Sequence, residues 1–198
     1  MEKGFLYIIF KAVLDKLKYL NLVELFKYIA VKTNPQKEKA LSRFGTDIFI
    51  LVKWLFVFVI WFSGASNCLI TIFVWYLIAT NIYTYFIYHI WNDEALDTSA
   101  LDNDSIRRRF LNLMLAVAFS DFAFAYLYRI PYMAEFSWTS AANISGNSLW
   151  YSISNSLAAN YDIVSPLSEL GYSISMGQLI LTFIFVTIII SRSIPQKN

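Results

Sequence analysis

Few side chains in this sequence are suited to chemistry, and those that stand out lie within or beside apolar stretches. Asp121 lies near the middle of the apolar run 110–130, and Asn160 and Asp162 follow a short apolar segment. An ionisable residue inside a membrane-spanning segment is a functional candidate by default, because its burial in lipid is costly. These residues are therefore the first candidates for a functional site.

Asp121 has a second interpretation, which we favour. Its carboxyl group can be buried against another helix and hydrogen-bonded to a neutral partner such as Asn81 or Tyr83. In that case Asp121 is neutral or paired within the helix bundle and supports stability more than function.

The remaining composition argues against an enzyme. The single cysteine, Cys68, excludes an internal disulfide and a cysteine metal site, and the single histidine, His89, argues against a histidine-ligated metal or a Ser-His-Asp triad. No glycine-rich phosphate-binding loop is present. A net charge of +2 is too small to indicate nucleic-acid binding. We therefore expect no enzyme activity, no cofactor, no bound metal and no nucleic-acid partner.

The hydropathy pattern predicts an all-α membrane protein. Of the residues in the chain, 58% are hydrophobic and only 15% are charged, whereas about a quarter of the residues in a soluble domain are charged. A membrane-spanning helix needs about 20 mostly apolar residues. Four segments are predicted to cross the bilayer: 48–62, 69–91, 110–130 and 171–190.

The positive charges predict the orientation of these four spans. Of the 16 Lys and Arg residues, nine precede Asp47, and Arg107–Arg109 lie between the second and third spans. The linkers 63–67 and 131–170 contain none. Because cytoplasmic loops are enriched in Lys and Arg, we expect a multi-pass protein of the cell membrane with both termini in the cytoplasm.

The N-terminal segment 4–31 is predicted to form one amphipathic helix that ends at Asn34-Pro35. Lys11, Asp15 and Lys18 share its polar face, so the helix either lies on an anionic membrane surface or packs against the bundle. The predicted organisation comprises this cytoplasmic or interfacial segment (1–46), a first transmembrane hairpin (47–92), a cytoplasmic loop (93–109) and a pore domain (110–198).

The linker before the last span has an unusual pattern. Residues 148–159 are apolar enough for a helix, with Ser148 as N-cap, but too few to cross the bilayer. A turn-rich stretch, NYDIVSPLSE, follows. A short helix and irregular backbone at membrane depth are tolerated only where protein or a watery cavity surrounds them. The pattern therefore predicts a re-entrant pore helix between the last two spans.

This region resembles the pore of two-transmembrane-type potassium channels, in which SLYFSxxTxTTxGYGDxxP precedes a leucine-glycine pair. Here the corresponding stretch reads SLWYSISNSLAANYDIVSPLSELG, and Gly177-Gln178-Leu179 followed by a β-branched run and Ser191-Arg192 resembles the inner helix. The resemblance covers residues 110–192. It implies a homotetramer with an outer helix, a pore helix and an inner helix from each copy.

The resemblance also implies the site residues. The selectivity filter would be Ala158, Ala159, Asn160, Tyr161 and Asp162. Within the inner helix, Gly177 is either a gating hinge or a close-packing glycine. By their spacing, Thr182, Phe185 and Ile189 form one stripe that either lines the pore or faces lipid. Relative to the family, Ala158 lacks the threonine hydroxyl, and Tyr161 is followed directly by Asp162 without the second glycine. We therefore expect passive conduction of a monovalent cation, K⁺ or Na⁺, with weak or altered potassium selectivity.

Two other functions stay open at this point. The chain could be a non-conducting, modulatory subunit with a degenerate pore. It could also be a small membrane-anchored interaction or effector protein that uses its helices only as an anchor. A tetramer is expected for the channel and the modulatory subunit but not for the anchor.

Overall fold

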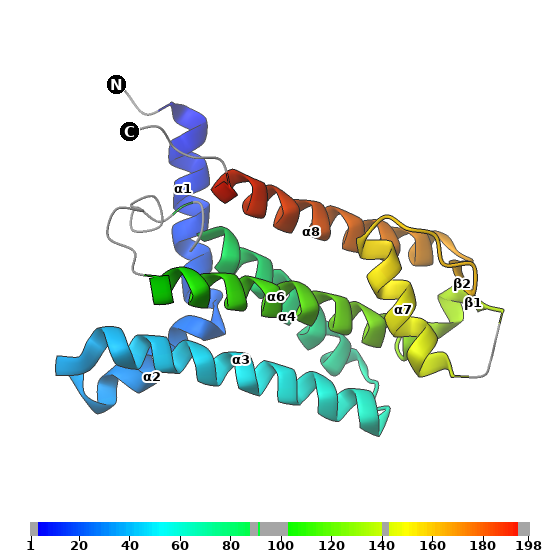
Figure 1. The fold of residues 1–198 in the computed structure, drawn as a ribbon, viewed down its shortest axis with the longest axis horizontal. Helices are drawn as coiled ribbons and strands as arrows, with labels where there is room; N and C mark the ends of the chain where they lie inside the picture. Colours follow the sequence, from blue (N-terminus) through cyan, green and yellow to red (C-terminus); the bar gives the residue numbers. More distant parts are fainter. Residues whose placement is uncertain (1–3, 88–90, 92–102, 140–142, 194–198) are drawn as a thin grey trace. The chain divides into compact units, whose positions relative to one another are not determined.

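The computed structural model of the chain describes residues 4–87, 91, 103–139 and 143–193, which are mostly helical (Figure 1). His89 and most of the predicted cytoplasmic loop lie outside these ranges. The chain divides into two compact units, Met1–Leu55 and Phe56–Asn198, with the boundary inside one long helix. Each unit is described on its own.

The N-terminal unit contains two helices where the sequence predicted one. Helix α1 (Phe5–Leu17) and a 3₁₀ turn, η1 (Lys18–Leu20), precede α2 (Leu22–Thr33). The prediction of one helix over 4–31 is wrong at Asn21, whose backbone is extended (φ −89°, ψ 115°) and whose side-chain oxygen accepts a hydrogen bond from Val23 N at 3.1 Å. Asparagine competes for backbone groups in this way and favours helix starts.

The first long helix packs closely on α2 within this unit. After α2 ends at Thr33 and a turn η2 (Pro35–Lys37), α3 (Glu38–Ser63) begins. A Cβ atom at Gly45 would lie only 2.8 Å from the carbonyl oxygen of Phe26, so glycine permits this approach. The rings of Phe26 and Phe49 meet edge to face with centroids 5.4 Å apart.

Within the described residues, four helical segments are long and apolar enough to cross a membrane, which agrees with the number of predicted spans and indicates a membrane protein. They are 35–63, 68–86, 107–129 and 169–188. The first consists of η2 and α3. The other three lie in α4 (Cys68–Phe86), α6 (Asn103–Arg129) and α8 (Glu169–Ser193). The first is longer than predicted, because its helix begins well before the apolar run.

The core of the C-terminal unit lies around the second half of α6. Every residue from Ala123 to Tyr128 is fully buried. Aromatic rings surround this segment: Trp61 lies 4.8 Å from Phe122, and Trp75 lies 5.5 Å from Phe124, both measured between ring centroids. Such aromatic contacts contribute large buried areas and defined geometry to a core.

Hydrogen bonds bring the two linkers without basic residues to the same end of this unit. The Tyr126 hydroxyl at the end of α6 donates to Ala65 O, in the linker between α3 and α4, at 2.8 Å. Arg129 Nη1 donates to Trp61 O at 3.2 Å, and its guanidinium lies 4.6 Å from the Trp61 ring. A cation beside the last carbonyls of a helix interacts favourably with the helix dipole.

The linker between α6 and α8 contains a short helix, α7 (Ile144–Ser156), as predicted, but the helix begins earlier. Its N-cap is Asn143, whose side chain accepts from Gly146 N at 3.0 Å. The prediction of Ser148 as N-cap is therefore wrong: Ser148 is fully buried inside the helix and donates to Ser145 O.

A small antiparallel pair of strands, β1 (Phe136–Trp138) and β2 (Val164–Pro166), closes the linker. It was not predicted. Figure 1 shows the pair beside α7, at the end of the unit where α6 stops and α8 starts. A Cβ atom at Gly171 would lie 2.5 Å from Glu135 O, so the start of α8 lies closely against the residue that precedes β1.

Candidate functional site

The most distinctive feature of the C-terminal unit is a cluster of polar side chains where α6, α7 and α8 meet. We call this cluster the Gln178 network. Its members are Asp121 and Tyr128 of α6, Ser152 and Asn155 of α7, and Ser175 and Gln178 of α8. Because unsatisfied polar groups in an apolar interior are costly, such a cluster requires a complete set of hydrogen bonds.

The side chain of Gln178 is fully buried and forms hydrogen bonds through both ends of its amide. Its oxygen accepts from the Tyr128 hydroxyl at 2.6 Å and from Asn155 Nδ2 at 2.9 Å. Its nitrogen donates to Ser152 O at 2.9 Å and to Ser152 Oγ at 2.7 Å. One amide therefore links the inner face of α8 to both other helices.

A second set of contacts joins α7 to α8 one turn earlier. Asn155 Nδ2 donates to Ser175 O at 2.9 Å, and the Tyr151 and Ser175 hydroxyls lie 2.9 Å apart. Burial raises the pKa of the Tyr151 hydroxyl, so this group stays protonated as a neutral hydrogen-bond partner. The last two turns of α7 are thus fixed to α8 by side chains.

Asp121 belongs to this network and has different partners from those that the sequence suggested. Its Oδ1 accepts from Gln178 Nε2 at 3.2 Å, and Ser156 is a further hydrogen-bond partner of the carboxyl group. Asn81 instead donates to Ala116 O and Ser120 Oγ, at 2.9 and 3.1 Å. Asp121 is therefore held by α7 and α8, and Asn81 joins α4 to α6.

The predicted filter begins as the cap of α7. Ala159 N donates to Ser154 O at 2.8 Å and Ala158 N to Asn155 O at 2.9 Å, the two bonds of a Schellman motif. Ala158 accordingly has a left-handed backbone with φ 53°. Glycine is the usual residue there because a Cβ atom is strained in this region.

The rest of the predicted filter is a turn, exposed except for the half-buried Tyr161, and it is hydrogen-bonded to the residue that follows β1. The carbonyls of Tyr161, Asp162 and Ile163 each accept a hydrogen bond within the chain, from Val164 N, Thr139 Oγ1 and Thr139 N respectively. Among the described residues, no donor reaches the carbonyls of Ala158, Ala159 or Asn160. Within the part of the chain that the structure describes, these three successive carbonyls have no hydrogen-bond partner, and we call them the open carbonyls.

The polar side chains of this turn are also arranged by local contacts. Asn160 Nδ2 donates to Asp162 Oδ1 at 2.5 Å, and both residues are exposed. The Tyr161 hydroxyl donates to Asn147 Oδ1 at 3.2 Å, which fastens the turn back onto α7. We call residues 157–163 the mouth segment.

The four predicted pore-lining residues do not share one open face of α8. Phe185 is 1% exposed and its ring lies 6.1 Å from that of Tyr85 in α4. Thr182 is half-buried, and the side chain of Ile189 lies outside the described residues. A Cβ atom at Gly177 would meet nothing within 4 Å, so no close contact within the chain requires glycine there.

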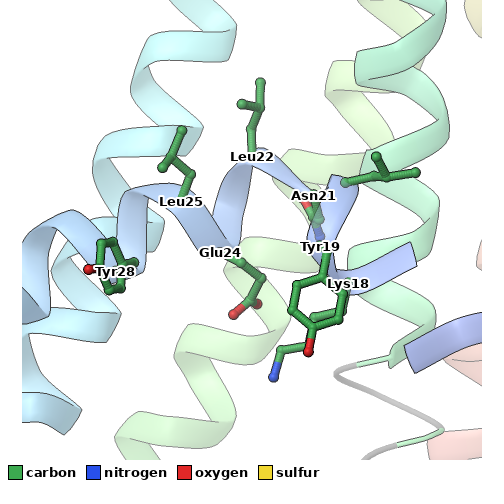
Figure 2. A pocket seen from close by; sticks show the side chains of 8 residues that line it. Lys18, Tyr19, Asn21, Leu22, Glu24, Leu25 and Tyr28 are labelled. Atoms are coloured by element: carbon green, nitrogen blue, oxygen red, sulfur yellow. The ribbon is translucent and has the colours of Figure 1, made fainter. Parts of the chain in front are cut away.

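A separate surface hollow of about 460 Å³ lies in the N-terminal unit and contains none of the predicted site residues. It is formed by η1 and the start of α2. Figure 2 shows Lys18, Glu24 and Tyr28 among its lining side chains. Nearby, Lys27 pairs with Glu24 at 3.0 Å, and burial lowers the pKa of Lys27 more than this pairing raises it. The hollow has no arrangement that indicates a ligand.

Sequence reasoning missed Gln178 as the centre of the site. Gln178 was noted only as part of the resemblance to the inner helix. Ser152, Asn155 and Tyr128 were not predicted as site residues. The available signal was a carboxamide in the middle of an apolar span. Among the described residues no group of three or more His, Cys, Asp or Glu side chains could hold a metal ion.

Comparison with known proteins adds no relative to this description. No family model, no curated protein and no solved structure matches the chain. The functional argument therefore depends on the geometry described above.

The first prediction concerns the charge of Asp121. Asp121→Asn should change the free energy of unfolding by less than about 1 kcal/mol, because an amide oxygen still accepts from Gln178. Asp121→Leu removes this buried acceptor and should cost about 1–3 kcal/mol. Unfolding of the purified protein in detergent measures both values. Equal losses for the two variants would show that the charge, rather than the acceptor, is needed.

The second prediction concerns the cap of α7. Ala158→Gly should stabilise the protein by about 0.5–1 kcal/mol, since it relieves the left-handed strain at φ 53°. Ala159→Gly is the matched control, because its backbone is not in that region, and it should be neutral or destabilising. The same unfolding measurement applies. A destabilising Ala158→Gly would contradict the described cap.

Proposed function

We propose that the chain is the subunit of a tetrameric cation channel with potassium-channel-like pore architecture. In this proposal α6 is the outer helix, α7 the pore helix and α8 the inner helix. Four mouth segments surround the pore axis. The channel conducts monovalent cations passively, with weak selectivity for K⁺ over Na⁺.

The observation that carries the proposal is the placement of α7. This helix has 13 residues, too few to span a bilayer, yet its polar side chains are paired with α6 and α8 between the two spans. The mouth segment that follows it is exposed up to Asn160 and connects back to α8 through β2. A short helix and an exposed turn between two spans suit a re-entrant pore loop.

The chemistry of the mouth segment suits a hydrated cation. The end of α7 contributes the partial negative charge of a helix C-terminus. The open carbonyls of Ala158, Ala159 and Asn160 and the carboxylate of Asp162 add further oxygen atoms. Discrimination between dehydrated K⁺ and Na⁺ depends on closely arranged rings of such oxygens. Three open carbonyls, with no hydroxyl at position 158, favour a wider and less selective mouth.

The proposal includes the orientation predicted from charge. Both termini lie in the cytoplasm, and the mouth segment lies outside. The contact between Tyr126 and Ala65 supports this topology, since it brings both linkers without basic residues to one end of the bundle. The lipid bilayer and further copies of the chain are the partners.

A second candidate function, a non-conducting modulatory subunit, is favoured by one observation. The carbonyls of Tyr161 and Asp162 accept hydrogen bonds within the chain, and Asn160 binds Asp162 across the turn. These contacts hold the second half of the mouth segment in the local fold. Carbonyls engaged in this way cannot bind a permeant ion, so such a subunit would not conduct and would instead modulate conducting subunits by assembling with them.

The third prediction tests conduction. Purified protein in planar bilayers should carry a cation current whose reversal potential under bi-ionic K⁺ and Na⁺ conditions lies near zero. Asp162→Asn should lower the current roughly two- to fivefold at low salt, because it removes the carboxylate that concentrates cations. High salt should reduce this difference by screening.

Glu169→Gln is the matched control, since Glu169 is an exposed carboxylate in the first turn of α8, outside the mouth segment. It should leave the current within the variation of the parent. A strong preference for K⁺ would contradict the proposed selectivity. No current from a verified tetramer would favour the modulatory subunit.

A further inference from the structure

Gln178 connects α8 to α7 through several hydrogen bonds, so a movement of α8 acts on α7. Its side chain is fully buried, and its amide contacts Ser152 in the third turn of α7 and Asn155 in the last. Hydrogen bonds have narrow ranges of distance and angle. A rotation or slide of α8 therefore either carries α7 with it or breaks several bonds at once.

A single residue, Asn155, connects this turn of α8 to the mouth segment. Asn155, which bonds both Gln178 and Ser175, also supplies through its carbonyl the acceptor for Ala158 N in the α7 cap. A displacement of Asn155 changes the left-handed turn at Ala158. The open carbonyls of the mouth segment begin at that residue.

The remainder of α8 is held differently. Below Gln178, Phe185 packs against the ring of Tyr85 in α4, while Ile180 and Phe183 are exposed. Apolar contacts of this kind are non-directional and tolerate sliding better than a hydrogen-bonded amide does. The polar contact at Gln178 is thus the point at which α8 and α7 have the least freedom.

We infer that Gln178 is a positioning residue that couples the position of α8 to the conformation of the mouth segment through α7. Asp121 supplies the reference point on α6. The inference rests on the proposed function, because it assigns the coupling to the segment proposed as the channel mouth. It goes further by naming the contact through which the inner helix would control that mouth.

The test substitutes the two members of the pair formed by the Gln178 amide and the Asp121 carboxyl group. Gln178→Glu places a second carboxyl group beside Asp121, so the network is broken when both are ionised and restored when one is protonated. The other titratable groups facing this position are Tyr128 on α6 and Tyr151 on α7, which stay neutral between about pH 5 and about pH 8. Combining Gln178→Glu with Asp121→Asn restores one amide and one carboxyl group.

The readout is the rate at which a polar thiol reagent modifies Asn160→Cys in a Cys68→Ala background. The rate is measured at about pH 5 and about pH 8. At each pH the rate of a variant is divided by the rate of the Asn160→Cys protein that retains Gln178, and this ratio is the normalised rate. For Gln178→Glu the normalised rate should rise severalfold with pH. The double exchange leaves one carboxyl group without a like charge beside it, so its normalised rate should rise less with pH than that of Gln178→Glu alone, although the two bonds to Ser152 stay lost. Gln178→Met, which cannot form the hydrogen bonds, should raise the normalised rate at both pH values.

Ser173→Ala is the control, because this exposed serine of α8 bonds only its own helix through Glu169 O, and its rate should equal that of the parent. Should Gln178→Glu fail to assemble, Ser152→Ala removes one acceptor of the Gln178 amide and should raise the rate by a smaller factor. Parent-like rates at both pH values in every folded network variant would overturn the inference.

Current recorded from the same variants separates the two proposals. If the labelling changes as expected while no variant and no parent conducts, the coupling stands and the proposed channel function fails. If the parent conducts, and Gln178→Glu alters neither labelling nor current, the channel function stands and the coupling is wrong.

Discussion

The side-chain amide of Gln178 is excluded from solvent, so in a membrane-spanning helix only the protein itself can satisfy its hydrogen bonds. This constraint determines much of the C-terminal unit. The partners come from two other helices, so the hydrogen bonds of this one amide hold α7 against both α6 and α8. A purely apolar contact would have left α7 free to slide. The amide fixes the position and rotation of the short helix relative to α6 and α8.

The ends of the mouth segment are fixed by two further devices that depend on that placement. At its start the Schellman cap ends α7 at Ala158, where the backbone turns left-handed. At its end β2 leads into α8, whose first turn approaches Glu135, the residue before β1, so closely that a Cβ atom at Gly171 would lie 2.5 Å from its carbonyl oxygen. Between these points the chain exposes three carbonyls and a carboxylate. A rigid frame around a short polar turn is the arrangement that the proposed function requires.

The sequence predicted those parts of the fold that depend on hydropathy alone. The four spans follow from long apolar runs, and the end of α2 follows from Asn34-Pro35. The break at Asn21 was missed because Asn21, Glu24 and Lys27 continue the polar face of Lys11, Asp15 and Lys18, and only the side-chain cap reveals it. Asn143 and Ser148 are both good N-caps, and local sequence could not decide between them. The strands β1 and β2 have three residues each, too few for an alternating pattern.

The site was predicted less well, for a physical reason. The polar partners of Gln178 lie up to 57 residues away along the chain, so their meeting is a property of packing and not of spacing. Asp121 was found because a charge in an apolar run is conspicuous, but its partner was not. Phe185 was predicted from its spacing to line the pore; its burial beside Tyr85 depends on tertiary packing that spacing does not contain, and its role at a pore stays a prediction.

The most direct test of the account is the mass of the assembly in mild detergent with retained lipid. Native mass spectrometry, checked by light scattering, should give four copies of the 22.9 kDa chain. A tetramer is required for a central axis surrounded by mouth segments. A stable monomer would contradict both the channel and the modulatory subunit, and would leave a membrane-anchored interaction protein as the function.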